Sequence, residues 1–79
     1  MVARMALKPL ARLVRDRRVK LLWTQATLAR RSGVSRWTIN NIERSRRAKT
    51  LSPLVAGRLG EALGVNLLPY IGRERDGAA

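Results

Sequence analysis

The twenty residues from Thr24 to Glu43, TQATLARRSGVSRWTINNIE, decide the fold. Two short segments with apolar residues three or four apart are separated by Gly-Val-Ser. Thr24 and Ser35 each precede one segment, where a hydroxyl oxygen can accept a hydrogen bond from a first-turn backbone N–H. Gly33 suits the left-handed conformation that commonly ends a helix. The stretch therefore predicts two short helices joined by a tight turn.

The second of these segments carries polar and aromatic side chains that a purely structural helix does not need. Arg36 directly follows the Ser35 cap, so it projects from the helix N-terminus, and arginine can donate two hydrogen bonds to guanine. Asn41 lies five residues on, and asparagine can pair with adenine in the same two-point manner. Trp37 has two interpretations, a contact with a thymine methyl or a sugar, or a lid on the core or on the preceding helix.

The composition points to a polyanionic partner and away from catalysis. The 79 residues include 17 Lys and Arg against 5 Asp and Glu, a net charge of +12. Such a field favours DNA, RNA or an anionic membrane surface, and arginine favours two-point contacts with phosphate or guanine. A GC-rich genome also enriches arginine, but it does not deplete the acids. Without His or Cys, the usual catalytic bases and zinc ligands are missing. We therefore expect no enzyme, no cofactor and no metal.

The flanking segments complete an all-α prediction. Helices are expected over 9–21 and from the Ser52-Pro53 start to about Leu63, where Gly64 ends the helix. A short fifth helix or turn is expected after Asn66. Apolar residues expected to face the core are Leu10, Leu13, Val14, Val19, Leu21, Trp23, Leu28, Ala29, Val34, Ile39, Ile42, Val55, Leu59, Ala62 and Leu63. The prediction is a compact bundle of about five short helices.

Domain organisation follows from the same pattern. We expect a flexible basic arm at 1–8, one domain at 9–72 and a disordered tail at 73–79. No segment approaches the ~20 apolar residues that span a bilayer, and no targeting signal is evident, so a cytoplasmic protein is expected.

The motifs together resemble the lambda-repressor/Cro-like helix-turn-helix family, also called XRE. The resemblance rests on Thr24-Gln25, Leu28-Ala29, Gly33-Val34-Ser35, Ile39, Ile42-Glu43, Leu59 and Ala62-Leu63-Gly64-Val65. It covers roughly 13–68. It implies a double-stranded DNA operator as the partner, with the recognition helix, about 35–44, in the major groove.

The resemblance also implies roles for individual residues. Arg36, Trp37 and Asn41 match base-contacting positions, with Asn40 beside them. Gln25 matches a glutamine that clamps a phosphate and braces the recognition helix. Arg18 and Glu43 match a structural ion pair. Contacts with phosphate are expected from Thr24, Gln25, Ser35, Arg44, Arg46, Arg47 and Lys49. For Arg46, Arg47 and Lys49 the alternative is simple solvation, and for Arg30 and Arg31 it is stabilisation of a helix dipole.

Three positions depart from the family pattern. Leu22 stands where the family commonly has Gly, so either a different turn or a longer first helix is expected. Ser45 replaces a common Gly, and the loop before Ser52 is slightly longer than usual.

The function expected is a sequence-specific transcription regulator, such as a phage or mobile-element repressor or Cro-like protein. Alternatives are an antitoxin or restriction–modification controller, a nonspecific architectural or RNA-binding protein, and an adaptor that does not bind DNA. We expect a homodimer on DNA that is mostly monomeric when free, with no small-molecule ligand and no membrane partner. The candidate dimer surface is Leu67, Leu68, Tyr70 and Ile71, with closure of the core as the alternative for Leu67 and Ile71.

Overall fold

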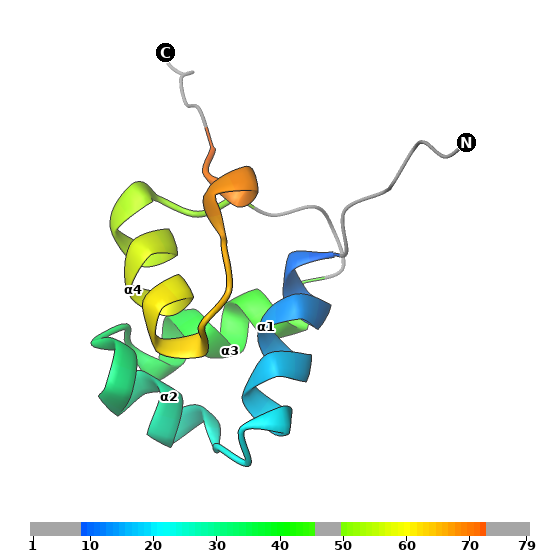
Figure 1. The fold of residues 1–79 in the computed structure, drawn as a ribbon, viewed down its shortest axis with the longest axis vertical. Helices are drawn as coiled ribbons and strands as arrows, with labels where there is room; N and C mark the ends of the chain where they lie inside the picture. The colour runs from blue at the N-terminus through cyan, green and yellow to red at the C-terminus, as the bar shows by residue number, and fades with distance from the viewer. Residues whose placement is uncertain (1–8, 46–49, 73–79) are drawn as a thin grey trace.

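The computed structural model describes residues 9–45 and 50–72. Its elements are α1 (Leu10–Lys20), α2 (Gln25–Ser32), α3 (Arg36–Arg44), α4 (Pro53–Leu63) and the three-residue 3-10 helix η1 (Leu68–Tyr70) (Figure 1). The expected arm at 1–8, the basic residues Arg46, Arg47 and Lys49, and the expected tail at 73–79 lie outside the described residues. None of the helices in these two ranges is long and apolar enough to cross a membrane.

The all-helical prediction is confirmed, but residues 9–45 and 50–72 contain four α-helices rather than the expected five or so. The last segment forms only the short η1, because the residue after it pairs with Leu51 instead of continuing a helix. Leu51 forms an isolated parallel β-bridge with Ile71, in which the Leu51 N–H donates to the Tyr70 carbonyl at 2.8 Å. The Asn66 side chain accepts a hydrogen bond from the Leu68 N–H at 3.0 Å, as expected of a turn-forming asparagine.

The helix boundaries follow the predicted caps. The hydroxyl oxygens of Thr24, Ser35 and Ser52 accept hydrogen bonds from the backbone N–H three residues later, at 3.0, 3.1 and 3.2 Å. Gly33 and Gly64 end α2 and α4 with φ of 78° and 71°, a conformation that glycine adopts at little cost. Local sequence therefore fixes where α2, α3 and α4 begin and where α2 and α4 end.

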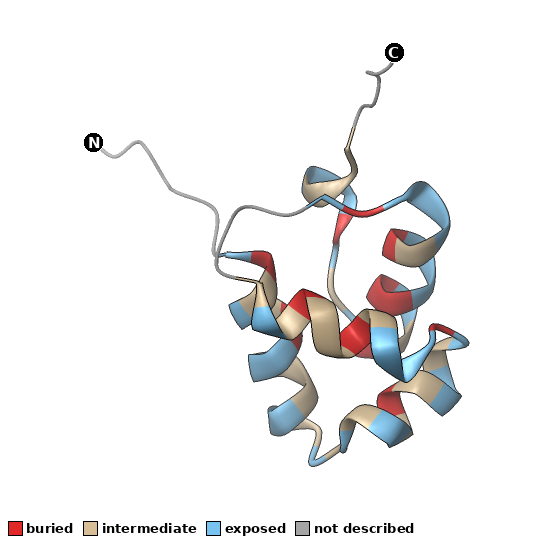
Figure 2. Ribbon diagram, turned by 180° about the vertical axis from the view of Figure 1, so that it is seen from behind, coloured by how far each residue is buried: buried red, intermediate tan, exposed pale blue. Residues whose placement is uncertain are grey.

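A single core lies between the helices (Figure 2). α3 packs against α1 and α2, and α4 packs against α2, α1 and η1. The buried hydrophobic residues are Leu10, Val14, Leu28, Val34, Ile39, Ile42, Leu51, Ala56, Leu59, Leu63 and Leu67. Leu13, Leu21, Trp23, Ala29, Val55 and Ala62 are partly buried against them. α3 is therefore clamped on its inner side by two helices and leaves its outer side open.

Val19 departs from the expected core set, since 52% of its surface is exposed. An α-helix turns about 100° per residue, so Val19 lies about 140° around the axis from the buried Val14. The apolar stripe of α1 is therefore shorter than predicted and ends before Val19.

The turn between α1 and α2 corrects a second expectation. α1 ends at Lys20, so it is not longer than usual. Leu22 instead takes the left-handed conformation itself, with φ of 63°, and is 90% exposed. It is the only non-glycine residue with positive φ in the described part of the chain. Leu22 therefore does what glycine commonly does in the family and carries the strain of its Cβ.

The candidate dimer surface is also corrected. Leu67 is only 2% exposed and belongs to the core, while Tyr70 and Ile71 are half-buried against it. Leu68 alone of the four is largely exposed, at 67%. The alternative interpretation, closure of the core, is therefore right for Leu67, because the turn after α4 directs it inward.

Candidate nucleic-acid interface

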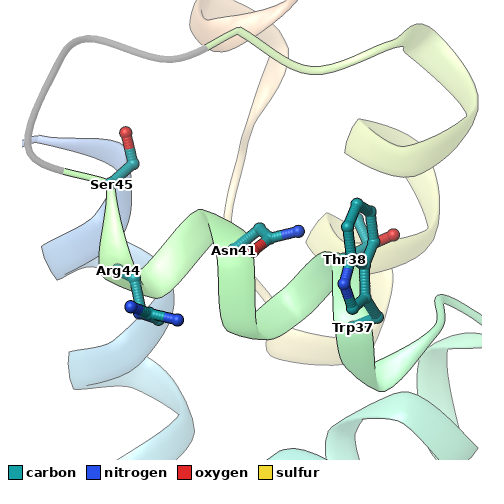
Figure 3. Close-up of a pocket in the computed structure, with 5 residues that line it drawn as sticks. All are labelled: Trp37, Thr38, Asn41, Arg44 and Ser45. Carbon is teal, nitrogen blue, oxygen red and sulfur yellow. The ribbon is translucent and has the colours of Figure 1, made fainter.

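The outer face of α3 carries residues for which the sequence predicts contacts with DNA. This face is formed by Arg36, Trp37, Asn41 and Arg44. Residues 37, 41 and 44 follow one another at helical spacing and line one hollow with Thr38 and Ser45 (Figure 3). Arg36 and Asn40 line a neighbouring hollow on the other side of the Trp37 ring. The structure therefore brings the expected base-contacting residues together on one helix.

These side chains are presented to solvent rather than to the protein. Arg36, Trp37 and Arg44 are exposed and Asn41 is half-buried. Within the described ranges, none of the four side chains makes a hydrogen bond or ion pair with another described residue. Trp37 is 74% exposed, so the interpretation of Trp37 as a lid is wrong. Donor and aromatic groups on this face are thus available to an external partner.

The inner side of α3 holds the opposite arrangement, an inner network of Arg18, Glu43, Gln25 and Asn40. Arg18 from α1 donates from Nε and Nη2 to the two carboxylate oxygens of Glu43, each at 2.8 Å. Gln25 Nε2 donates to Glu43 Oε1 at 3.2 Å, and Asn40 Nδ2 donates to Gln25 Oε1 at 3.3 Å. The ion pair expected between Arg18 and Glu43 is therefore present, and the network joins α1, α2 and α3.

The ion pair between Arg18 and Glu43 is largely shielded from water, and it holds α3 against α1. The exposed fractions of the Arg18 and Glu43 side chains are 14% and 5%. The hydrogen bond to Glu43 raises the pKa of Arg18 further above its ordinary value, although burial acts in the opposite direction. Arg18 also donates from Nη1 to the Trp23 carbonyl at 2.8 Å. One guanidinium therefore positions both the end of α3 and the turn before α2.

Asn40 is placed differently from the other expected base contacts. Its amide nitrogen is directed at Gln25, and its side chain is half-buried. Gln25 in turn stands at the first position of α2, next to the Thr24 cap. This geometry favours a bracing role for Asn40 and places Gln25 between the N-terminus of α2 and α3.

The other basic residues divide by their surroundings. Arg44 is exposed at the last position of α3. Arg30 is exposed in the last turn of α2, and the Arg31 guanidinium lies over the Trp23 ring at 4.9 Å from its centre. A cation is attracted to the face of an indole ring, so Arg31 makes a structural contact within the protein in addition to contributing to the positive charge of the surface.

Three side-chain contacts were not expected from the sequence. Thr38 lines the same hollow as Asn41, and its Oγ1 accepts a hydrogen bond from the Ser35 hydroxyl at 2.9 Å. Arg17 donates to the Leu63 carbonyl at 2.7 Å, and Arg58 donates to the Gly33 carbonyl at 3.3 Å. Both arginines satisfy carbonyls at helix C-termini, which lack partners within the helix. No local sequence pattern identifies these pairs, because their members are 46 and 25 residues apart.

Two short helices joined by a glycine turn, with the second presenting donors outward, define a helix-turn-helix protein. A family model described as Helix-turn-helix matches residues 14–69. The chain belongs to this XRE/lambda-repressor-like family of DNA-binding transcription regulators. No curated protein and no solved structure matches the chain.

Proposed function

We propose that the protein binds double-stranded DNA at specific sequences, with α3 in the major groove. The observation that carries this proposal is the outer face of α3. Two arginines, a tryptophan and an asparagine point outward there, on a helix that fits the major groove. The net charge of +12 supplies the long-range attraction to phosphate. An α-helix fits the major groove, where each base pair offers a distinct pattern of donors and acceptors.

Individual contacts follow from side-chain chemistry. Arg36 donates two hydrogen bonds to guanine, and Asn41 pairs with adenine. Arg44 contacts the backbone at the far end of α3, together with Arg46, Arg47 and Lys49 of the following segment. Thr24, Gln25 and Ser35 stand at the N-termini of α2 and α3, where backbone N–H groups and the helix dipole favour a phosphate. Asn40 contributes through Gln25 rather than through a base.

The inner network supports this assignment by holding the recognition helix rigidly. Arg18 and Gln25 both contact Glu43, so α3 is fixed to α1 and to α2 from within. Base contacts need side chains held close to their productive positions by supporting contacts. Because Gln25 is also a proposed phosphate contact, it links a bound phosphate to α3, the helix that contacts bases.

A two-fold dimer on an inverted repeat is the assembly we propose. A single recognition helix covers few base pairs, and two copies would set theirs ~34 Å apart, one turn of DNA. Leu68, at 67% exposure, and Leu54, at 62%, are the exposed apolar residues at the α4–η1 end of the molecule. Because net charge opposes association, we expect monomers without DNA and two chains per operator with it. Sedimentation of a saturated operator complex would measure this ratio.

Selection of bound duplexes from a random pool tests the proposed function. A recovered inverted repeat, bound against excess random duplex, is the expected result. Recovery of unrelated sequences with equal affinity would instead indicate the nonspecific architectural protein. A footprint without two-fold symmetry, with one chain per site, would contradict the dimer.

The finer biological role proposed is a repressor or Cro-like switch, in which a bound dimer excludes other proteins from the same DNA. Its origin in a phage or mobile element, and the antitoxin or restriction–modification alternative, stay predictions. They differ in the genes beside the operator.

A further inference from the structure

The two tryptophans of this chain have opposite environments. Trp23 is partly buried against the core, and its ring is covered by Arg31 at 4.9 Å. Trp37 is 74% exposed at the second position of α3. Packing within the described protein accounts for Trp23. It leaves most of the Trp37 ring, a large apolar surface, without a partner.

The immediate surroundings of Trp37 are polar. Figure 3 shows its ring standing at one end of a hollow whose other labelled residues are Thr38, Asn41, Arg44 and Ser45. The hollow on its other side is lined by Arg36 and Asn40. Among the described residues of the outer face, the indole is thus the apolar element within a set of hydrogen-bonding groups. A ligand that matches this face must offer an apolar group surrounded by hydrogen-bonding atoms.

The floor of the major groove contains one such group. Guanine, adenine and cytosine present only acceptors and amino donors there, whereas thymine adds its C5-methyl group beside the O4 acceptor. 5-Methylcytosine carries the same methyl group at the same position, beside an amino donor. Contact with an aromatic ring removes that methyl from water, which is favourable.

We propose that Trp37 is a specificity-determining residue that recognises the C5-methyl group of a pyrimidine, thymine or 5-methylcytosine, in the major groove. The proposal rests on the proposed function, because it needs α3 in that groove. Arg36 and Asn41 distinguish bases by hydrogen bonds on either side of the ring. Trp37 then adds a contact that unmethylated cytosine cannot make.

Deoxyuridine scanning of a selected operator tests this inference. Each thymine is replaced in turn by deoxyuridine, which removes the methyl group and keeps every hydrogen-bonding atom. One position per bound chain should weaken binding about fourfold, the fold-change that corresponds to ~0.8 kcal/mol for one buried carbon. Trp37→Ala should bind more weakly and lose sensitivity at that position. Trp37→Phe should keep the sensitivity, and Glu61→Gln, on the exposed surface of α4, should match the unmodified protein.

A second comparison uses the other methylated base. At the sensitive position, a duplex with 5-methylcytosine opposite guanine should bind about fourfold more tightly than one with cytosine. Trp37→Ala should bind the two duplexes equally.

The outcomes separate this inference from the proposed function. An operator that is bound specifically but is insensitive to every deoxyuridine overturns the role of Trp37 and leaves the proposed function standing. Equal deoxyuridine effects in the unmodified protein and in Trp37→Ala overturn it too. Loss of binding in Trp37→Phe without any deoxyuridine effect assigns the indole N–H instead, which also overturns the proposal. If no sequence is selected at all, both proposals fail.

Discussion

The two sides of α3 use the same kinds of residue for opposite purposes. In the inner network, the side chains of Arg18, Gln25 and Asn40 all donate hydrogen bonds to other residues of the network. The Arg18 and Glu43 side chains are only 14% and 5% exposed. On the outer face, Arg36, Trp37, Asn41 and Arg44 have no such partner in the described part of the chain. The nine residues of α3 thus contribute Asn40 and Glu43 to a polar cluster that is satisfied within the protein, and form a second polar face that is not.

The difference shows how a small domain carries a binding surface. Buried polar groups destabilise a fold unless they are hydrogen-bonded, so the inner groups must be matched within the chain. Exposed groups need no internal partner, because water solvates them until a ligand replaces it. The outer face departs from the local rules of stability at a place where an external partner is expected. Changes to the inner network should therefore alter folding stability, and changes to the outer face should alter DNA binding.

Salt should produce the largest effect, and it should act on DNA binding and not on the inner network. If a dimer neutralises ~6–10 phosphates, DNA affinity should fall ~10³–10⁵-fold between about 50 and 200 mM salt. The ion pair inside the network is shielded by burial and should keep the thermal midpoint of the free protein nearly constant over this range. Titrations of operator binding and thermal melts at the same salt concentrations measure the two. A flat affinity would refute electrostatic docking.

Glu43→Gln should have the next largest effect, on folding stability. The substitution leaves the Arg18 charge without its carboxylate in a largely buried site, which costs about 3 kcal/mol. For a domain of this size that loss should lower the thermal midpoint by more than about 10 °C. Glu61→Gln removes an acid of the same kind from an exposed position of α4 and should change the midpoint by less than about 2 °C.

A double variant separates the charge from the packing. Replacing both Arg18 and Glu43 by Met should recover most of the stability lost in Glu43→Gln, because no unpaired charge then remains. An unchanged midpoint in Glu43→Gln itself would show that the pair is energetically no stronger than a surface ion pair.

Arg36→Ala should affect specificity, while Arg44→Ala should affect affinity in general. Loss of a two-point contact with a base costs about 1–3 kcal/mol against the operator and little against random DNA. Loss of a phosphate contact weakens both about equally and reduces the salt slope by about one. Competition titrations with operator and random duplexes measure both variants. If Arg36→Ala weakens operator and random DNA by the same factor, its assignment to a base fails. Neither variant should lower the thermal midpoint.

Local patterns predicted most of the fold, because its helix boundaries are local. Ser52, Gly33 and Gly64 act on backbone groups within four residues, and their effects are visible in the sequence. Val19 was misplaced, and two alternatives were left open for Leu67, for the opposite reason. Their burial depends on how far around a helix, or after which turn, the chain meets the rest of the core.

The candidate site was predictable to a similar extent. The outward positions of Trp37, Asn41 and Arg44 follow from helical spacing along α3, and that of Arg36 follows from the Ser35 cap. The ion pair of Arg18 with Glu43 was expected only through the family resemblance, since 25 residues separate them. The link from Asn40 to Gln25, and the arginines at helix C-termini, depend on tertiary placement that no local pattern encodes.

The smallest predicted effect concerns Leu22, which holds the turn that Arg18 anchors through the Trp23 carbonyl. Its left-handed φ of 63° costs about 1–2 kcal/mol for a residue with a Cβ, and its 90% exposed side chain recovers little by packing. Leu22→Gly removes that strain, although the more flexible unfolded chain offsets about 0.5–1 kcal/mol. We therefore expect a net gain of about 0.5–1 kcal/mol, a rise of about 2–8 °C in the thermal midpoint. Leu22→Ala keeps the Cβ and should show no such rise, so that the pair of variants isolates backbone strain from the exposed side chain. A lower midpoint for Leu22→Gly than for Leu22→Ala would mean that the inner network, and not the residue at the turn, determines the stability of the α1–α2 connection.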